Sequence, residues 1–448
     1  MRSNSVSPAR LAAFEILLRV ADGAYASVLL PAREAELGPQ DRGLCHELVM
    51  GVLRRQLWLD RLAEHYSNRK VADLDLPVRI ALRLGLYQLR FLSRVPASAA
   101  VNESVNLVHS VRLRSAGSFV NAILRRATRE PDLDPTSNIH EPLEYLSVAT
   151  SHPAWLLERW LEAFGPAEAE AFAFSNNEVP PVAFRVVTSR ASEDDVYERL
   201  RQAGAELVPS KFAKGGWRVK GGGSLLAELA AAGQIYLQDE ASQLVAAALD
   251  AQPGERVLDL CAAPGSKTTQ IADRSLDAAG LGALVVAADL HEHRLRTLVS
   301  AAHLQGLSNI HSVALDGLLH LPLREGFFDR VLVDAPCSGT GTLRRNPEIR
   351  WRISPANIEE MRVRQTQLLD NAARAVKPDG RLIYSTCSVE HDENEAVVQT
   401  FLENNESFRP GQLGIDAALG THPGMARTWP HRQGTDGFFI CALQRTGE

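Results

Sequence analysis

Apolar residues recur every three or four positions through the first part of the chain, which is the spacing of an amphipathic helix. The pattern predicts helices over residues 9–20, 44–62, 78–92 and 115–129. Glycine and proline residues separate these segments, and a polar stretch with two prolines follows at 130–138. We therefore expect an all-helical domain over residues 1–140.

The middle of the chain mixes helical and strand patterns. Helical spacing continues to about residue 175, and apolar runs then predict strands over 182–187 and 217–220. Between these strands, Ser192 and Asp195 fit a capping box that opens a helix. Residues 141–237 are therefore interpreted as a small α/β connector that could bind RNA. Its modest basic patch, which is more typical of ordinary surface, consists of Lys211, Lys214, Arg218 and Lys220.

From residue 238 onward, short apolar runs alternate with helical segments. The expected strands cover residues 256–260, 283–289, 310–315, 330–334, 381–385 and 438–443. Helices between the first five strands predict a parallel sheet with right-handed crossovers. The fold class predicted for residues 238–448 is therefore α/β, with a Rossmann-like, doubly wound sheet.

The composition indicates a folded protein and argues against membrane, zinc-binding and disulfide-rich proteins. The 448 residues are 45% hydrophobic and 23% charged, which is typical of a folded chain of two or three domains. No apolar run approaches the roughly 20 residues of a membrane-spanning helix, and residues 1–8 lack the apolar core of a signal peptide. The five cysteines include no Cys-x-x-Cys pair, which argues against a zinc site or a disulfide framework. We expect a cytoplasmic protein with neither a membrane segment nor a metal.

Charge is unevenly distributed along the chain. Residues 1–140 hold 19 Arg and Lys against 14 Asp and Glu, whereas the remainder holds 29 against 40. A positive helical domain suggests an anionic partner such as RNA, and Arg125, Arg126 and Arg129 are candidates to face it. The excess is small, and a solvated helical surface whose last cations suit the helix dipole explains it as well.

One strand-turn-helix stretch, residues 257–269, organises the chemistry predicted for the carboxyl-terminal domain. Its apolar strand ends in a turn at Pro264 and Gly265, and such a turn lies at the carboxyl end of a strand, where ligands bind. Asp289 ends the next strand, where an acidic side chain usually accepts hydrogen bonds from ribose hydroxyls. An adenosine-bearing ligand is therefore expected, and Asp316, after the third strand, could contact its adenine. A loop cap is the alternative use of any single acid here.

Two cysteines follow the fourth and fifth expected strands, which should be neighbours because consecutive elements usually are. Cys337 closely follows Asp334, and Cys387 lies between Thr386 and Ser388. A lone cytoplasmic cysteine is usually inert, but a pair that faces a ligand cleft suggests nucleophilic chemistry. A thiolate that adds to C6 of a cytosine turns C5 into an enamine-like carbon that can attack a sulfonium methyl. Asp334 could hold the N3/N4 edge of such a base.

Three motifs extend this hypothesis through a resemblance. Asp-Leu-Cys-Ala-Ala-Pro-Gly-Ser-Lys-Thr-Thr at 259–269, Asp-Ala-Pro-Cys-Ser-Gly-Thr-Gly at 334–341 and Tyr-Ser-Thr-Cys-Ser-Val-Glu at 384–390 resemble motifs of the RNA 5-methylcytosine methyltransferases, the Sun/Fmu/NOL1 family. The helical domain looks like a NusB-type RNA-binding domain. The resemblance implies S-adenosylmethionine as cofactor and, as reaction, methylation of C5 of a 16S ribosomal RNA cytosine, cytosine-967, through a covalent adduct at C6.

Residue roles follow from the same resemblance. Cys387 matches the nucleophile of the family's Thr-Cys motif, and Cys337 matches the Pro-Cys cysteine that assists product release. Asp334, through the contact with the base described above, is expected as the third catalytic residue. The implied cofactor contacts are Cys261, Ala262, Ala263, Pro264, Gly265, Ser266, Lys267, Asp289, Asp316 and Asp334. The family usually has a second glycine where this chain has Ser266, which puts the cofactor affinity in question. The implied partner is 16S rRNA or a small-subunit assembly intermediate, bound by a monomeric enzyme.

A cluster of arginines around Trp351 follows the Pro-Cys motif, and cations beside an aromatic ring suit RNA phosphates and an unstacked base. Its members are Arg344, Arg345, Arg350 and Arg352. An exposed charged loop is the alternative. Two other functions stay open, namely the same chemistry on transfer RNA and a ribosome assembly factor that binds RNA without catalysis. The presence of Asp334, Cys337 and Cys387 argues against the second.

Overall fold

The computed structural model describes residues 6–447 and divides the chain into two compact units. The first unit holds the chain up to Val179 together with a later segment, Leu343–Arg352, and the second holds Pro180–Thr342 and Ile353–Glu448. Residues 141–179, which we expected in the connector, thus lie with the amino-terminal helices, whereas residues 180–237 lie with the carboxyl-terminal sheet. Across residues 6–447, every helix is too short or too polar to span a lipid bilayer.

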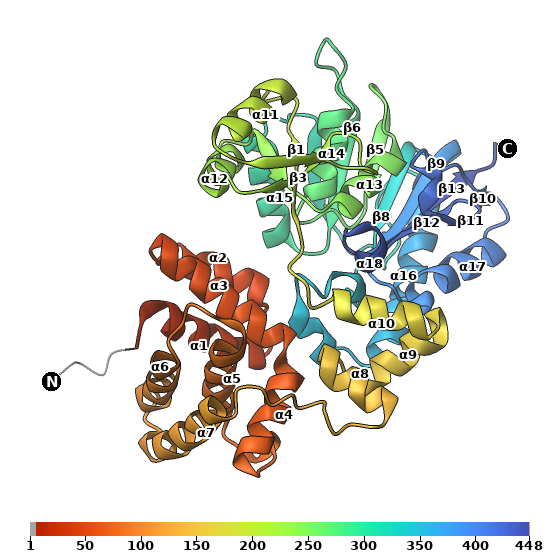
Figure 1. Ribbon diagram of the computed structural model, residues 1–448. Coiled ribbons are helices and arrows are strands. Elements are labelled where there is room, and N and C mark those ends of the chain that lie inside the picture. Colours follow the sequence, from red (N-terminus) through yellow and green to blue (C-terminus); the bar gives the residue numbers. More distant parts are fainter. Residues whose placement is uncertain (1–5, 448) are drawn as a thin grey trace. The chain divides into compact units, whose positions relative to one another are not determined.

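The first unit is built of helices (Figure 1). They are α1 (Pro8–Ala21), α2 (Ala26–Glu34), α3 (Pro39–Arg54), α4 (Gln56–Ser67), α5 (Leu76–Phe91), α6 (Ala97–Ser110), α7 (Gly117–Arg129), α8 (Pro142–Thr150), α9 (Ala154–Phe164) and α10 (Pro166–Ser175). The apolar faces of α1 to α7 form one core, in which Phe14, Leu48 and Leu62 are fully buried. The single helix predicted over 44–62 is wrong, because Arg55 is non-helical between α3 and α4. Apolar spacing continues across this break, so the pattern could not show it.

The second unit begins with a small antiparallel sheet in the order β2-β3-β1-β4. Its elements are β1 (Val182–Val186), α11 (Glu193–Gln202), β2 (Glu206–Pro209), β3 (Gly216–Lys220), α12 (Gly223–Ala231) and β4 (Ile235–Leu237). β1 and β3 lie where the apolar runs predicted strands, whereas β2, α12 and β4 were not predicted. α11 begins directly after Ser192, but no side chain caps it, so the predicted capping box is wrong.

A mixed sheet of nine strands forms the larger part of the second unit, in the order β11-β12-β13-β9-β8-β5-β6-β7, with β10 paired to β13. Its strands are β5 (Arg256–Asp259), β6 (Leu284–Asp289), β7 (Ile310–Ala314), β8 (Phe328–Asp334), β9 (Val376–Thr386), β10 (Phe408–Pro410), β11 (Gly420–His422), β12 (Met425–Thr428) and β13 (Phe438–Arg445). The helices are α13 (Glu240–Leu249), α14 (Ser266–Arg274), α15 (Glu292–Leu304), α16 (Pro355–Ala375), α17 (Glu395–Asn404) and α18 (Pro430–Gln433). Strands β5 to β9 run parallel and β13 is antiparallel, so the predicted Rossmann-like α/β class is confirmed. Residues 315–327, between β7 and β8, form turns instead of the expected helix.

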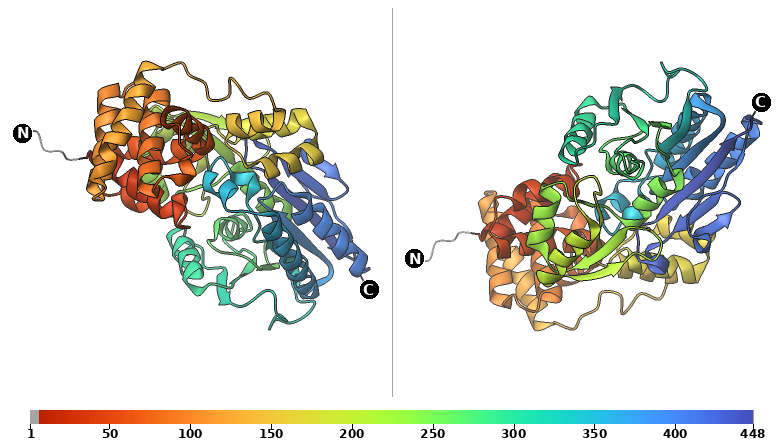
Figure 2. Two further views of the ribbon diagram at one scale, coloured as in Figure 1. Left: turned by 90° about the horizontal axis from the view of Figure 1, so that it is seen from below. Right: turned by 90° about the horizontal axis from the view of Figure 1, so that it is seen from above.

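Helices cover both faces of this sheet (Figure 2). Successive strand residues point to opposite faces, so Leu258 and Val331 pack on one side with α16 and α17. Val257 and Leu332 pack on the other side with α13 and α14. This alternation buries both faces and fixes the register of the strands.

The register brings the ends of three strands to one edge. Leu258 pairs with Val331 between β5 and β8, and Asp334 pairs with Ser385 between β8 and β9. Because these strands are parallel, the residues that follow their carboxyl ends gather at the same edge. The cofactor turn (residues 260–265), the Pro-Cys turn (335–338) and the Thr-Cys turn (386–388) therefore meet there, and β8 and β9 are neighbours as the sequence predicts.

Candidate active site

The cofactor turn depends on Gly265. Its φ of +109° lies in the left-handed region, and a Cβ added there would meet the side chain of Leu298 at 2.7 Å. Both constraints favour glycine, so the backbone can pass close to α15 before α14 begins. Ser266 is the first residue of α14 and has no such constraint, since a helical position needs no glycine.

Two of the predicted cofactor-binding acids already bond to the backbone. Asp289 is 6% exposed and accepts hydrogen bonds from the N–H groups of Ala263 at 3.1 Å and His291 at 3.0 Å. It thereby ties the end of β6 to the cofactor turn. Asp316 accepts from the N–H of Leu318 at 2.9 Å. These bonds cap loops, yet each carboxylate oxygen keeps a second lone pair for a ligand.

Asp259 supports the cofactor turn from beneath. Its carboxylate accepts from the Thr268 hydroxyl at 2.7 Å, and the residue is 1% exposed. Burial raises the pKa of Asp259 to about 7, although the hydrogen bond from Thr268 opposes the shift. Asp259 therefore joins β5 to α14 and is not available to a ligand.

Asp334 and Lys267 form an ion pair at the same edge. Lys267 Nζ donates to Asp334 Oδ2 at 2.6 Å, and Ser385 Oγ donates to Oδ1 at 2.8 Å. Burial acts to lower the pKa of Lys267, but the charge and hydrogen bond of Asp334 outweigh burial and raise it. Lys267 therefore stays charged, and the carboxylate is held in one orientation. Lys267, which we expected among the cofactor contacts, thus has its ammonium on Asp334.

The two predicted cysteines lie side by side. Cys337 Sγ and Cys387 Sγ are 3.3 Å apart, a hydrogen-bonding contact, and both thiols are free and partly exposed. The hydrogen bond with Cys387 and burial raise the pKa of Cys337 well above the ordinary value of a thiol. Cys337 therefore stays protonated near neutral pH. Cys261, in the cofactor turn, is also free, and burial raises its pKa.

Two residues that the sequence analysis did not single out lie beneath the cysteine turns. Asn394 accepts from the Thr386 hydroxyl at 2.6 Å and donates to the carbonyl of Ser388 at 2.9 Å. Glu393 accepts from the N–H of Ser338 at 2.8 Å. The only signal in the sequence was a Glu-Asn-Glu run soon after the Thr-Cys motif, which ordinary helix-start residues explain equally well.

Three of the four arginines that follow the Pro-Cys motif are buried or hydrogen-bonded within the first unit. Arg350 is fully buried and donates to the carbonyls of Thr150 and Ser151 at 3.2 and 3.1 Å. Arg344 is 2% exposed, and Arg352 donates to carbonyls at and after the end of α1. Backbone carbonyls accept the hydrogen bonds of Arg350 and Arg352, and Arg344 is buried, so the predicted contact with RNA phosphates is wrong for these three residues. A run of cations has the same composition whether it faces solvent or buried backbone.

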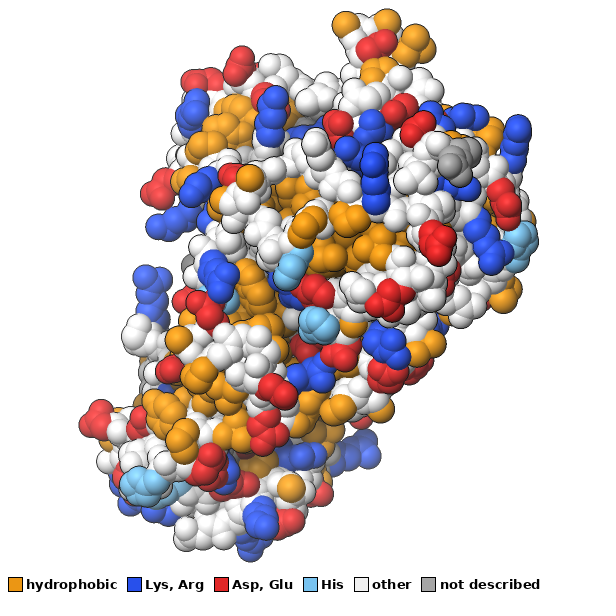
Figure 3. All heavy atoms as spheres, turned by 90° about the vertical axis from the view of Figure 1, so that its right-hand side faces the viewer, with side chains coloured by type: hydrophobic (Ala, Val, Ile, Leu, Met, Phe, Trp, Pro, Cys, Tyr) orange, Lys and Arg blue, Asp and Glu red, His pale blue; other side chains and the backbone are white. Residues whose placement is uncertain are grey.

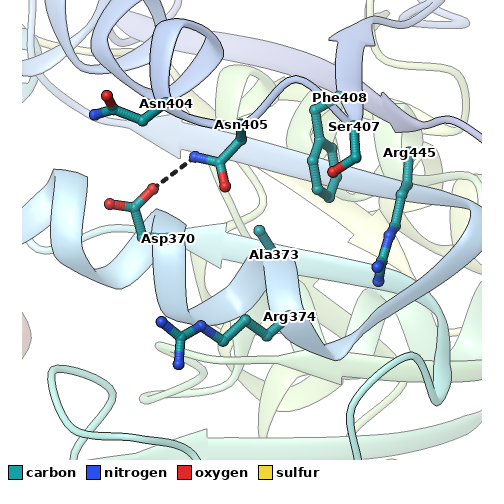
Figure 4. Close-up of a pocket in the computed structure, with 8 residues that line it drawn as sticks. All are labelled: Asp370, Ala373, Arg374, Asn404, Asn405, Ser407, Phe408 and Arg445. Atoms are coloured by element: carbon teal, nitrogen blue, oxygen red, sulfur yellow. Dashed lines mark hydrogen bonds between the residues drawn. The ribbon is translucent and has the colours of Figure 1, made fainter.

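A surface pocket of about 310 Å³ lies elsewhere in the second unit, among α16, α17, β10 and the end of β13 (Figure 4). Asn405 donates to Asp370 there at 2.9 Å, and Arg374 and Arg445 line the pocket. The register of β13 on β9 puts Arg445 near the amino end of β9, at the sheet edge opposite the two thiols. The pocket is therefore separate from the candidate active site.

Family models match this chain along three stretches. The model described as 16S rRNA methyltransferase RsmB/F matches residues 246–444, and the NusB family matches residues 7–129. The ferredoxin-like domain of RsmF/B-like methyltransferases matches residues 152–225. The three matches therefore cover the helical part, the connector and the sheet that carries the thiols.

Similar proteins match nearly the whole chain. A probable ribosomal RNA small subunit methyltransferase B of Bacillus subtilis is 33% identical over 97% of this chain and 98% of its own. Ribosomal RNA small subunit methyltransferase B of Pseudomonas putida is 35% identical over the same shares. A solved methyltransferase homologue from Pyrococcus horikoshii covers 68% of this chain and 99% of its own, with 28% identity and a TM-score of 0.59. A further solved structure covers 98% of this chain and 99% of its own, at 28% identity and a TM-score of 0.82.

Proposed function

This chain belongs to the 16S rRNA methyltransferase RsmB/F family, and we propose that it methylates C5 of one 16S rRNA cytosine, cytosine-967, through a covalent cysteine adduct. Membership makes the protein an S-adenosylmethionine-dependent rRNA methyltransferase. The observation that carries the finer proposal is the contact of two thiols, 3.3 Å apart, at the sheet edge that also holds Asp334.

The cofactor is assigned to the turn and helix start at 261–267, with Asp289, Asp316 and Asp334. The fit rests on Asp289, because a buried carboxylate that accepts from Ala263 can accept further from ribose hydroxyls beside the turn. When bound, S-adenosylmethionine supplies an electrophilic methyl group. Lys267 serves this site indirectly, since its ammonium holds the Asp334 carboxylate.

Cys387 is assigned as the nucleophile. Its thiolate sulfur adds to C6 of the cytosine, and the electron pair of the C5–C6 double bond gives C5 enamine character. Asp334 accepts hydrogen bonds from the N3/N4 edge and thereby favours uptake of a solvent proton at N3 as negative charge develops there; this proton returns to solvent when the C5–C6 double bond forms again. Lys267 and Ser385 fix this carboxylate with hydrogen bonds of 2.6 and 2.8 Å. C5 is then nucleophilic enough to accept the methyl group.

Cys337 is assigned to product release. The C5 proton must leave, the C5–C6 double bond must form again, and the bond from C6 to the Cys387 sulfur must break. Cys337 is protonated and touches Cys387, so it can give its proton to the departing sulfur and accept the C5 proton in return. The exchange leaves Cys337 a thiol, as it began, and leaves Cys387 protonated, so Cys387 must lose this proton to solvent before its thiolate can attack again.

The proposed partner is 16S rRNA or a small-subunit assembly intermediate in the cytoplasm, bound by a monomer. The helical domain of residues 1–140 and the connector of residues 141–237 are assigned to RNA binding. The match of residues 7–129 to the NusB family and the excess of cations in this part of the chain support the assignment.

Bisulfite sequencing of ribosomal and transfer RNA from a deletion strain tests the proposed substrate. We expect one 5-methylcytosine to disappear from 16S rRNA, at cytosine-967, and to return when the intact gene is restored. Loss of a mark in transfer RNA alone would identify that RNA as the substrate. Unchanged marks in both RNAs would favour an assembly factor that binds RNA without catalysis.

A further inference from the structure

A buried carboxylate connects the Pro-Cys turn with the Thr-Cys turn. Glu393 is fully buried, and one of its oxygens accepts from the N–H of Ser338 at 2.8 Å and from the side chain of Gln365 at 3.0 Å. The other oxygen accepts from the hydroxyl of Ser388 at 2.5 Å and from the hydroxyl of Ser338. Glu393 thus bonds to the residue that follows each cysteine.

The neighbours of Cys337 are fixed on both sides. Gln365, which is fully buried on α16, donates to the carbonyl of Pro336 at 2.9 Å as well as to Glu393. Ser338 is held by Glu393 through its backbone and its side chain. Cys337 therefore lies between two anchored residues.

Cys387 lies in a similar arrangement. Asn394, which is fully buried, accepts from the Thr386 hydroxyl and donates to the carbonyl of Ser388. Glu393 accepts from the hydroxyl of the same Ser388. Glu393 is therefore the one group that bonds directly to both cysteine turns, within the network formed by Gln365, Glu393 and Asn394, here named the cysteine clamp.

The choice of a carboxylate at this position carries a cost. Burial raises the pKa of Glu393, while its hydrogen bonds from Ser338, Ser388 and Gln365 act to lower it. Over residues 6–447, no Lys or Arg forms an ion pair with Glu393, and a buried charge without a counter-ion is expensive. A carboxylate has acceptor sites alone, so it can bind these four donors from three residues at once, which an amide cannot.

We infer that Glu393 is a positioning residue for the proposed adduct mechanism, holding the Pro-Cys turn against the Thr-Cys turn so that the two sulfurs stay in contact. The inference rests on the proposed function. Attack on C6 needs the Cys387 sulfur alone, whereas release needs both sulfurs in contact. Loss of Glu393 should therefore slow release more than attack.

The test compares Glu393→Gln with Glu395→Gln in the full-length protein. Glu395 is a matched control because it begins α17 and bonds to Arg427 rather than to either cysteine turn. Each variant is mixed with S-adenosylmethionine and RNA that carries the target cytosine, and a denaturing gel measures the covalently trapped fraction. We expect Glu393→Gln to accumulate adduct and to lose up to about a hundredfold in product release, the loss that roughly 1 Å of misplacement causes. Glu395→Gln should release product without trapping.

Two serine variants keep the test decisive if Glu393→Gln does not fold. Ser338→Ala removes the hydroxyl bonds of the Pro-Cys turn to Glu393 and Ser388 and keeps the backbone bond to Glu393. Ser388→Ala removes the hydroxyl bonds of the Thr-Cys turn to Glu393, Ser338 and Thr340. Both variants loosen the link between the two turns, so both should trap more adduct than the wild type. Absence of extra trapping in Glu393→Gln, or in both serine variants where Glu393→Gln does not fold, overturns the inference. A wild-type protein that forms neither adduct nor product would overturn the proposed function instead.

Discussion

Similar side chains at the carboxyl edge have different surroundings. Asp259 and Asp289 end neighbouring parallel strands, yet Asp259 bonds to a hydroxyl beneath the cofactor turn while Asp289 bonds to the backbone of the turn itself. Cys337 and Cys387 also end neighbouring strands, and the raised pKa of Cys337 keeps that thiol protonated. Position at a strand end thus identifies candidate site residues. The hydrogen-bond partners of each side chain then show which role that residue can have.

Asp289→Ala should weaken cofactor binding by about 1–3 kcal/mol, the loss expected for hydrogen bonds to a charged acceptor. Calorimetry of the full-length protein with S-adenosylmethionine measures the change. Glu292→Ala is the control, because Glu292 lies three residues away, is exposed and pairs with Arg296. Equal affinity in the Asp289 variant and the wild type would remove Asp289 from the site.

The two cysteines should give opposite results when each is replaced. Cys387→Ala cannot form the C6 adduct, so methyl transfer should fall to background while the cofactor still binds. Cys337→Ala should form the adduct and transfer the methyl group, then stall because its exit step is not assisted. A denaturing gel with target RNA should show a retarded protein band for Cys337→Ala alone. The reverse pattern would exchange the two roles, and an active wild type without an adduct in either variant would exclude the covalent mechanism.

At the scale of elements, the sequence predicted the strands with strongly apolar runs and the site residues that follow their ends. The runs at β5, β8 and β9 are apolar enough to predict central strands, and their parallel order brings Asp334, Cys337 and Cys387 to one edge. The short strands β2 and β4 lack such a pattern. Each becomes a strand through its pairing with a neighbour, β2 with β3 and β4 with β1, and this pairing cannot be seen in the local sequence. The break at Arg55 was hidden because apolar spacing is the same on both sides of it.

The cysteine clamp could not be predicted, because its members come from separate elements. Gln365 lies in the middle of α16, and only the tertiary fold brings it to Pro336 and Glu393. The burial of Arg350 has the same origin, since its partners at Thr150 and Ser151 lie far away in the sequence. Sequence patterns report periodicity and local caps, whereas buried polar networks depend on long-range contacts.

Arg350→Met should destabilise the first unit locally. Burial lowers the pKa of Arg350 to about 9, and its guanidinium also donates to the carbonyl of Asn176 at 3.3 Å. Each buried carbonyl left without a donor costs about 1–3 kcal/mol, partly offset by removal of the buried charge, so we expect a loss on the order of 3 kcal/mol. Hydrogen exchange of the α8–α10 amides measures it, and the exposed Arg125→Met is the control. Unchanged protection in Arg350→Met would contradict a structural role.

At the scale of the whole molecule, RNA binding has to be reconciled with a net charge of −6. Figure 3 shows basic and acidic side chains interspersed over the face it presents. A nucleic-acid surface on such a protein must therefore be local. Arg125 and Arg129 in the last turns of α7 are exposed, and Arg69 and Lys70, just after the end of α4, are exposed as well. Arg126 donates to the backbone of Tyr66, so the ends of α4 and α7 lie together and their cations form one patch, the α4–α7 patch.

Substitutions in the α4–α7 patch test the helical domain more cleanly than its deletion. Removing residues 1–129 would leave Leu343–Arg352 without helices on which it packs, since Arg54 donates to the carbonyl of Arg344 at 2.8 Å. Replacing Arg125 and Arg129 together by alanine should weaken RNA binding and flatten its salt dependence, because each lost phosphate contact removes about one released counterion. Anisotropy titrations of labelled target RNA across a salt series measure the slope. Arg33→Ala, an exposed arginine of the same unit that pairs with Glu36, is the control. Cofactor affinity should not change in either variant, and an unchanged salt slope in the double variant would make this patch an ordinary solvated surface.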